Sequence, residues 1–393
     1  MTSILDGSSV RDGAEVHTPS GRHTLRRPVF NWYLPTRGDS HDPGVITPVE
    51  GLVHRPDRTA DLDYLALVAG AAERAGFDAA LTPVGLACID PWILCSALAA
   101  RTSHLKYIIA FRPSLASATL LAQQADTFRR LFGERLILNV TTGGSPVEQA
   151  AYGEHGSHDE RYQRTDEALQ VIRPLLAGEQ VTVRGDHLDV RDARLTNPGT
   201  ASVPIYFGGA SPAAVDVAAR QADTYLLWGE PPADVAERIR VVKARAAAVG
   251  RTLRFGLRVH ILTRDTAAQA WDTAEQMLAR FDPSAVAGLQ RRLAGMDSHG
   301  QARMTALHPG RSVRSADLVV SPNLWAGIGL VREGVATAVV GSHDEVAARL
   351  SDYVDLGVDE FILSGYPHLE ESLRVGEEII PRVHALRTQI GAA

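Results

Sequence analysis

The sequence has few cysteines and no long hydrophobic run. Cys88 and Cys95 are too few for a disulfide framework, and two thiols alone do not make a zinc site, so we expect no metal centre. No apolar run reaches the roughly 20 residues that a membrane-spanning helix needs. Residues 1–27 lack the apolar segment of a signal peptide, and we therefore expect a cytoplasmic protein with no membrane partner.

Positive charge is also scarce. The chain has 40 Lys and Arg residues against 46 Asp and Glu, a net charge of −6, which argues against a sequence-independent nucleic-acid-binding protein. Lys106 and Lys243 are the only lysines, so 38 of the 40 basic residues are arginines. GC-rich coding explains such a bias, and a special role for a guanidinium can be argued only at particular positions.

Several familiar catalytic patterns are missing. No H-E-x-x-H, G-x-S-x-G or phosphate-binding-loop spacing occurs, and Gly327-x-Gly329 lacks the third glycine of a dinucleotide fingerprint. Asp39 and Glu230 are the only carboxylates that follow predicted strands at the end where a barrel active site would lie. A hydrolase with paired carboxylates is therefore disfavoured.

The sequence does contain a regular alternation of strand and helix patterns. Apolar stretches predict strands at 30–36, 77–83, 105–112, 135–142, 204–209, 224–229, 253–262 and 360–366. Helical spacing occurs at 61–75, 91–101, 115–131, 159–176, 211–222, 232–248, 266–281 and 369–387. Eight buried parallel strands with eight helices predict an α/β protein with a (β/α)₈ barrel; a doubly wound open sheet is the main rival.

Three segments interrupt this alternation. Residues 1–27 are rich in Gly, Ser and charge and predict a flexible N-terminal arm ahead of a single barrel domain at 28–393. Residues 180–195 alternate as a β-hairpin does, with Arg184-Gly185-Asp186 at the turn. Residues 282–341 form a long insertion before the last strand, and connections of this length are usually functional or mobile.

Polar residues gather where the predicted strands end. Gly208-Gly209-Ala210-Ser211 follows a strand and opens a helix, which suits a phosphate; alternatively it is a tight turn with Ser211 as the helix cap. Arg258 and His260 share one face of a strand, and burial against helices would be costly, so we expect them inside the barrel unless they lie at a solvated end.

The remaining candidates each have an ordinary structural reading as well. Tyr366 and His368 could flank a turn at Pro367, Trp228 could be barrel packing, Cys88 an inert small side chain, and Arg303 a solvated surface residue. Together, a basic and aromatic mouth with a candidate phosphate loop indicates an anionic ligand, such as a phosphorylated cofactor.

At these residues the chain resembles the bacterial-luciferase-like flavin-dependent monooxygenases, and most of all the FMNH₂-dependent alkanesulfonate monooxygenases. The resembling segments are FNWYLPTRGD, LKYIIAFRPS, LILNVTTGGSP, HDERY, PIYFGGAS, TYLLWGEPP, RFGLRVHIL, GQARMTALHPG, SPNLWAGIGLVREG and FILSGYPHLEE. They are spread over residues 28–385, and SPNLWAG and LSGYPHLEE are specific to that subfamily.

The resemblance implies a two-component enzyme on a (β/α)₈ barrel, usually a homodimer or homotetramer. A separate NAD(P)H-dependent flavin reductase supplies FMN as FMNH₂, O₂ is the co-substrate, and the C–S bond of an organosulfonate is cleaved to give sulfite and an aldehyde. An insertion that closes as a lid fits this chemistry, because water must be kept from the reacting flavin.

The resemblance also assigns residues. Asn139, Tyr162, Ala210 and Ser211 are expected to contact FMN, and Cys88 to neighbour its ring. The expected substrate and catalytic pocket consists of Trp228, Arg258, His260, Arg303, Tyr366 and His368, with Arg303 on the lid.

One position departs from the family pattern. Arg37 stands where histidine is expected, and as an added charge at the mouth we include it among the substrate-binding residues. This departure leaves other substrates open, including a doubly anionic one, a sulfone or an amine. A deazaflavin-dependent dehydrogenase on the same barrel is the alternative that needs no oxygen.

Overall fold

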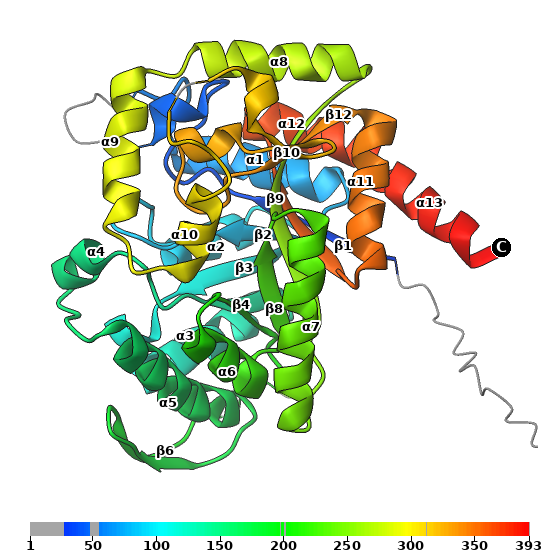
Figure 1. Cartoon of the computed structure of the whole chain (residues 1–393). Coiled ribbons are helices and arrows are strands. Elements are labelled where there is room, and N and C mark those ends of the chain that lie inside the picture. Colours follow the sequence, from blue (N-terminus) through cyan, green and yellow to red (C-terminus); the bar gives the residue numbers. More distant parts are fainter. Residues whose placement is uncertain (1–26, 48–54, 197, 200–201, 312, 393) are drawn as a thin grey trace, which may run out of the picture.

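Eight parallel strands close into a barrel in the computed structural model, which describes residues 27–47, 55–196, 198–199, 202–311 and 313–392. The strands follow one another around the barrel as β1, β2, β3, β4, β7, β8, β9 and β13, and β13 pairs with β1 to close it. Helices surround the strands (Figure 1). The predicted (β/α)₈ barrel is confirmed, and the open sheet is excluded because every one of these strands has two neighbours.

The elements have the following bounds. The strands are β1 Val29–Tyr33, β2 Ala79–Thr82, β3 Lys106–Phe111, β4 Leu136–Val140, β5 Val181–Arg184, β6 Asp189–Ala193, β7 Ile205–Gly208, β8 Thr224–Trp228, β9 Arg254–Arg264, β10 Val319–Ser321, β11 Leu324–Trp325, β12 Ala338–Ser342 and β13 Glu360–Ser364. The α-helices are α1 Leu62–Arg74, α2 Pro91–Ala99, α3 Ala118–Phe132, α4 Pro146–Ala151, α5 His158–Leu176, α6 Pro212–Gln221, α7 Pro232–Ala248, α8 Ala267–Ala279, α9 Pro283–Ala294, α10 His299–Thr305, α11 His343–Asp355, α12 His368–Arg374 and α13 Ile380–Ala392.

Strand β9 extends beyond the rim of the barrel. Its first half pairs with β8, where Trp228 lies opposite Arg258. Its second half pairs with β12, where Ala338 lies opposite His260. The inward face of β9 therefore carries Arg258 and His260 to the carboxyl end of the barrel, where a barrel enzyme has its active site.

One predicted helix forms but does not belong to the ring of helices around the barrel. The segment at 266–281 was expected to be the seventh helix of the ring, but α8 packs on β12 and the far end of β9. The ring position between α7 and α13 belongs to α11, which the sequence analysis missed. Ser342 and Glu345 form a capping box at its start, and this S-x-x-E spacing was the available signal.

The segments that interrupt the predicted alternation of strands and helices have different structures. The hairpin prediction is confirmed by the antiparallel pair β5 and β6. The insertion is not a plain loop, because α9, α10 and the small strands β10 and β11 lie within it and β12 ends it (Figure 1). The predicted last helix is divided by a π-helical turn at Val375–Ile379. The predicted arm at 1–27 lies almost wholly outside the described residues.

The interior of the barrel is apolar in the middle and polar at its closed end. Ile108, Ile137 and Ile362 pack together inside the strands. Below them the fully buried Glu360 accepts hydrogen bonds from Asn31 (3.3 Å) and Thr224 (3.1 Å), and also from Tyr206. With that end filled, a ligand can enter only at the opposite end.

Candidate active site

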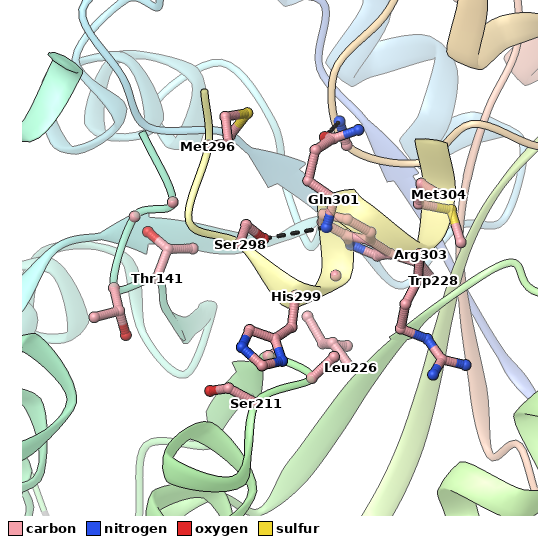
Figure 2. A pocket seen from close by; sticks show the side chains of 18 of the residues that line it. Thr141, Ser211, Leu226, Trp228, Met296, Ser298, His299, Gln301, Arg303 and Met304 are labelled. Atoms are coloured by element: carbon pink, nitrogen blue, oxygen red, sulfur yellow. Dashed lines mark hydrogen bonds between the residues drawn. The ribbon is translucent and has the colours of Figure 1, made fainter. Parts of the chain in front are cut away.

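A cavity of about 310 Å³ opens at the carboxyl ends of β4, β7 and β8. Its floor comes from the strand ends and its cover from the insertion (Figure 2). The predicted site residues among those lining it are Asn139, Tyr162, Ala210, Ser211, Trp228 and Arg303. The structure thus brings four predicted cofactor residues and two predicted substrate residues to one cavity.

The turn after β7 forms a cradle of backbone at one side of the cavity. Gly209 has φ of +146°, and a Cβ there would lie 2.9 Å from the Tyr162 hydroxyl and 2.6 Å from Ala214 Cβ. Only glycine fits this approach. Ser211 caps α6, its hydroxyl accepting a hydrogen bond from the Ala214 N–H (3.2 Å), and Pro212 at the first helical position has no N–H. The backbone that lines the cavity here is therefore that of Gly209, Ala210 and Ser211.

This cradle suits the phosphate of a cofactor. A helix N-terminus offers N–H donors and a favourable dipole to an anion. Tyr162 reaches the same place from α5, and burial raises the pKa of its hydroxyl, so it remains a proton donor at neutral pH. The residues fit FMN as far as its phosphate group is concerned.

Helix α10 of the insertion lies across the cavity (Figure 2). A Cβ on Gly300 would lie 3.2 Å from the Trp228 ring, so the helix backbone packs directly on that side chain. Arg303 forms an ion pair with Glu230 at 2.5 Å, and Gln301 accepts a hydrogen bond from the Gly334 N–H at 2.8 Å. Arg303 is therefore an exposed residue that is held by an ion pair.

A second ion pair fixes the start of this cover. Asp297 accepts a hydrogen bond from Arg161 on α5 at 2.6 Å, and its N–H donates to the Gly144 carbonyl at 3.1 Å. The insertion is thus tied to the barrel at both ends of α10. Its mobility, which the sequence suggested, stays a prediction.

The other predicted pocket residues do not line the cavity. Arg258, His260, Tyr366 and His368 form a buried group beside it, together with Tyr33 and Arg332; we call these six residues the basic cluster. Two links join cluster and cavity. Trp228 lines the cavity and pairs in register with Arg258, and Glu333, which also lines the cavity, directly follows Arg332.

Two guanidinium groups meet in the basic cluster without a carboxylate between them. Arg258 stacks over the Tyr33 ring at 4.6 Å, and Arg332 lies 6.0 Å from the same ring and 5.8 Å from the Tyr366 ring. In the described part of the chain neither forms an ion pair, and Arg258 donates only to the Val259 carbonyl (3.1 Å) and, more weakly, to the Ile362 carbonyl (3.5 Å). Burial lowers the pKa of Arg258 to about 10.

His260 is held as a neutral ring. Its Nδ1 lies 2.6 Å from the Ser364 hydroxyl, and its ring stacks on Tyr366 at 5.5 Å. Burial and the charges of Arg258 and Arg332 lower its pKa well below the usual range. We therefore expect His260 to orient or donate a hydrogen bond rather than to titrate near neutral pH.

Two predicted residues differ from expectation. Arg37 does not present a free charge, because it pairs with Glu333 at 2.6 Å, which in turn pairs with Arg292 on α9 at 3.1 Å. In this structure Arg37 connects the barrel to the insertion, and its role in binding the substrate stays a prediction. Cys88 is partly exposed, near Arg37, and is not among the residues lining the cavity.

Sequence reasoning missed Arg332 and two other residues of the site. Tyr33 lies in a strand that reads as apolar, and Asp39 was noted only as a carboxylate at the mouth. Arg332 had a usable signal, because it directly follows the apolar segment AGIGLV. Among the described residues, no three His, Cys, Asp or Glu side chains gather as a metal site would require, and no helix has the length and apolarity to cross a bilayer.

The structure thus has a parallel barrel, a cavity at the carboxyl ends of its strands, an insertion that covers the cavity and a basic cluster beside it. The model of the luciferase-like monooxygenase family matches residues 33–360. The protein therefore belongs to the luciferase-like monooxygenases.

Solved structures agree in fold. A riboflavin lyase with a modified FMN and riboflavin has a TM-score of 0.73 at 20% identity, over 94% of this chain and 93% of that one. A long-chain alkane monooxygenase has a TM-score of 0.74 at 19% identity, over 92% of each chain. A coenzyme F420-dependent tetrahydromethanopterin reductase from Methanopyrus kandleri has a TM-score of 0.62 at 16% identity, over 91% of this chain and 99% of that one.

Proposed function

We propose that the protein is the oxygenase of a two-component system that uses FMNH₂ and O₂ to cleave the C–S bond of an organosulfonate, releasing sulfite and an aldehyde. Family membership supports the flavin monooxygenase chemistry. The basic cluster beside the cavity supports an anionic substrate.

The observation that carries the substrate assignment is the pair Arg258 and Arg332. Two buried guanidiniums without carboxylate partners are costly unless an anion completes them. A sulfonate has three oxygens and one negative charge, and planar guanidinium forks bind such oxygens in pairs. Tyr366 adds a buried hydroxyl that has no hydrogen-bond partner within the described chain.

FMN is assigned to the cavity on the fit of its phosphate end. Ser211, Tyr162 and the backbone of the turn before α6 would hold the phosphate, with Asn139 on the strand floor. Reduced flavin, when bound, supplies the electrons that allow O₂ to react. Trp228 lines the cavity and pairs in register with Arg258 of the basic cluster, so the substrate would lie close to the flavin.

The covering helix excludes water. Met296 and Met304 line the cavity from the insertion, and the pair Arg303–Glu230 closes the side next to Trp228. A dry, closed site protects a reactive flavin from unproductive breakdown and strengthens the guanidinium interactions.

The proposal includes an NAD(P)H-dependent flavin reductase as partner, because the sequence has no dinucleotide fingerprint with which to bind the reductant itself. It further includes a cytoplasmic location and a homodimer or homotetramer, both of which rest on the family resemblance.

A deazaflavin-dependent dehydrogenase is the second candidate, favoured by the structural likeness to an F420-dependent reductase. A monooxygenase of a neutral sulfone or amine is the third, and it would leave both guanidiniums without an anion.

A matched panel separates these candidates. With FMN, NADH and a flavin reductase, aldehyde formation is measured for alkanesulfonates and for methyl sulfones of equal chain length, and sulfite is measured for the sulfonates. We expect aldehyde only from the sulfonates, with an equal amount of sulfite, and only with oxygen. Turnover of the sulfones alone, or oxygen-independent oxidation of an alcohol with F420, would replace the proposal with the corresponding alternative.

A further inference from the structure

Within the basic cluster, His368 is held by a carboxylate from another part of the barrel. Asp39 follows β1, and its Oδ1 lies 2.8 Å from His368 Nδ1 at the start of α12. Both side chains are fully buried. The two residues are 329 positions apart in the sequence, so only the closure of the barrel brings them together.

The Asp39 carboxylate accepts four hydrogen bonds. His368 Nδ1 and the Ser40 N–H (3.0 Å) donate to Oδ1, and the Tyr64 hydroxyl (2.5 Å) and the His368 N–H (2.7 Å) donate to Oδ2. These donors outweigh burial and lower the pKa of Asp39, so that the carboxylate is charged at neutral pH.

A charged carboxylate in this position selects one form of the imidazole. Because Asp39 can only accept at Oδ1, His368 must carry its proton on Nδ1. Its Nε2 then has a free lone pair. Nε2 is buried, has no hydrogen-bond partner in the described chain, and belongs to a ring that meets the Tyr366 ring edge-on at 5.1 Å.

We propose that Asp39 is a positioning residue that keeps His368 as a proton acceptor at Nε2, facing the site of the basic cluster. A proton that leaves the bound substrate moves to Nε2, giving an imidazolium whose charge is balanced by Asp39. The substrate keeps the electron pair of the broken bond to hydrogen. This inference rests on the proposed function for the identity of that substrate, but not for the state of the ring.

Helix capping is the competing explanation for Asp39. Pro367, the residue before α12, has no side chain that can cap it, and Oδ2 of Asp39 accepts from the first N–H of that helix. A cap needs one acceptor, which an asparagine amide also supplies. It does not need a charge directed at the imidazole, and this difference makes the two explanations separable.

Several charged or titratable groups face His368. Arg258 and Arg332 from the cluster lower its pKa, as burial does, and Asp39 raises it, with a net lowering. Tyr33 and Tyr366 also adjoin the ring. Removing the charge of Asp39 should therefore lower the pKa of His368 further, so the acidic limb of the rate profile moves to lower pH while the plateau falls.

The direct test is ¹⁵N NMR of the full-length protein labelled at histidine, with the His368 signal assigned by its loss in His368→Gln. We expect the Nδ1–H form in the wild type and a loss of that preference in Asp39→Asn. Asp57→Asn is the matched control, because Asp57 accepts from Ser40 in the same loop at 2.7 Å without contacting His368. A wild-type signal of the Nε2–H form overturns the proposal, as does an unchanged ring in Asp39→Asn.

A double-mutant cycle tests the catalytic consequence. We expect Asp39→Asn to lower kcat by roughly 10²-fold or more with KM and FMN affinity little changed, and Asp39→Asn/His368→Gln to be no slower than His368→Gln alone. Asp39 is only a helix cap if the reductions in kcat multiply in the double variant. The same holds if Asp39→Asn lowers heat stability and leaves kcat unchanged. If no sulfonate is turned over, the proposed function fails, and the NMR result still decides the state of His368.

Discussion

Arginine is the residue on which the proposed substrate site depends. Arg258 and Arg332 are buried side by side with aromatic rings, and their charges have no counterpart in the described protein. The lysine-poor composition gave no hint of this, because 38 arginines cannot all be functional. Arg258 could be predicted to face the interior of the barrel from its two-residue spacing to His260. Arg332 lies in the insertion, where no periodic pattern indicated which way its side chain faces.

Arg258→Lys should separate charge from geometry. Lysine keeps the positive charge but cannot form a two-pronged contact, so we expect kcat/KM for the best sulfonate to fall by roughly 10²-fold or more. Lysine also has an ordinary pKa about two units below that of arginine. Since burial already lowers the pKa of Arg258 to about 10, the alkaline limb of the pH profile should move toward neutrality in the variant.

Steady-state sulfite release between pH 6 and pH 10 measures both effects, with FMN titration as the control for cofactor binding. A variant with a wild-type rate and an unmoved alkaline limb would show that Arg258 does not contact the substrate.

The residues of the phosphate cradle can also be tested by substitution. Ser211→Ala with Tyr162→Phe removes two donors to a charged acceptor, each worth about 1.5–3 kcal/mol. FMNH₂ affinity should fall by roughly 10²-fold or more, measured anaerobically by fluorescence quenching. Riboflavin, which lacks the phosphate, should bind both proteins equally weakly. An equal loss for both ligands would instead mean that the cavity itself is disturbed.

Among the elements, the insertion provides the cover of the cavity. Helix α10 is fixed by Arg303–Glu230 at one end and by Arg161–Asp297 at the other. Glu230 also pairs with Arg238 of α7 at 2.8 Å, so this carboxylate joins the covering helix to the ring of helices. The sequence indicated an insertion here, but not its partners, because each ion pair joins residues far apart in the chain.

Glu230→Gln should therefore loosen the cover. We expect limited proteolysis of the variant to begin within residues 296–311 and to proceed faster than in the wild type, whereas FMNH₂ with a sulfonate should protect the wild-type segment. Asp234→Asn is the control, because Asp234 lies in the first turn of α7, close to Glu230 in the chain, but takes no part in these ion pairs. Equal cleavage rates in all three proteins, with and without ligands, would contradict the assignment of α10 as a closing element.

The elements also show where sequence patterns fail. All eight barrel strands were predicted, because strands buried on both faces leave continuous apolar runs. The seventh ring helix was misassigned, since α8 and α11 are equally amphipathic and only tertiary packing distinguishes them. β12 was missed because its apolar run, Ala338–Ser342, lies within a segment read as insertion.

At the scale of the molecule, the barrel brings distant residues to one end. Its polar closed end around Glu360 leaves the opposite rim as the place where strands 1, 4, 7, 8, 9 and 13 deliver their side chains. The list of candidate residues was mostly predictable from strand ends. Their division between the cavity and the basic cluster beside it was not, because it depends on how side chains from distant strands and the insertion pack together.

The whole protein should depend on an external source of reduced flavin. With FMN, NADH and oxygen but no reductase, we expect no oxidation of NADH above the protein-free rate, followed at 340 nm. Adding a flavin reductase should start turnover. Oxidation of NADH by the isolated protein would show a nicotinamide site that the sequence lacks and would remove the two-component proposal.

A single turnover that needs no reductase tests sulfonate cleavage by this protein most directly. The protein is mixed anaerobically with photoreduced FMN and a short alkanesulfonate, and oxygen is then admitted. We expect up to one sulfite for each reduced flavin bound, none without oxygen, and none from Arg258→Ala/Arg332→Ala. Consumption of oxygen with no sulfite from any sulfonate tried, by a protein that binds FMNH₂ normally, would contradict the proposed function.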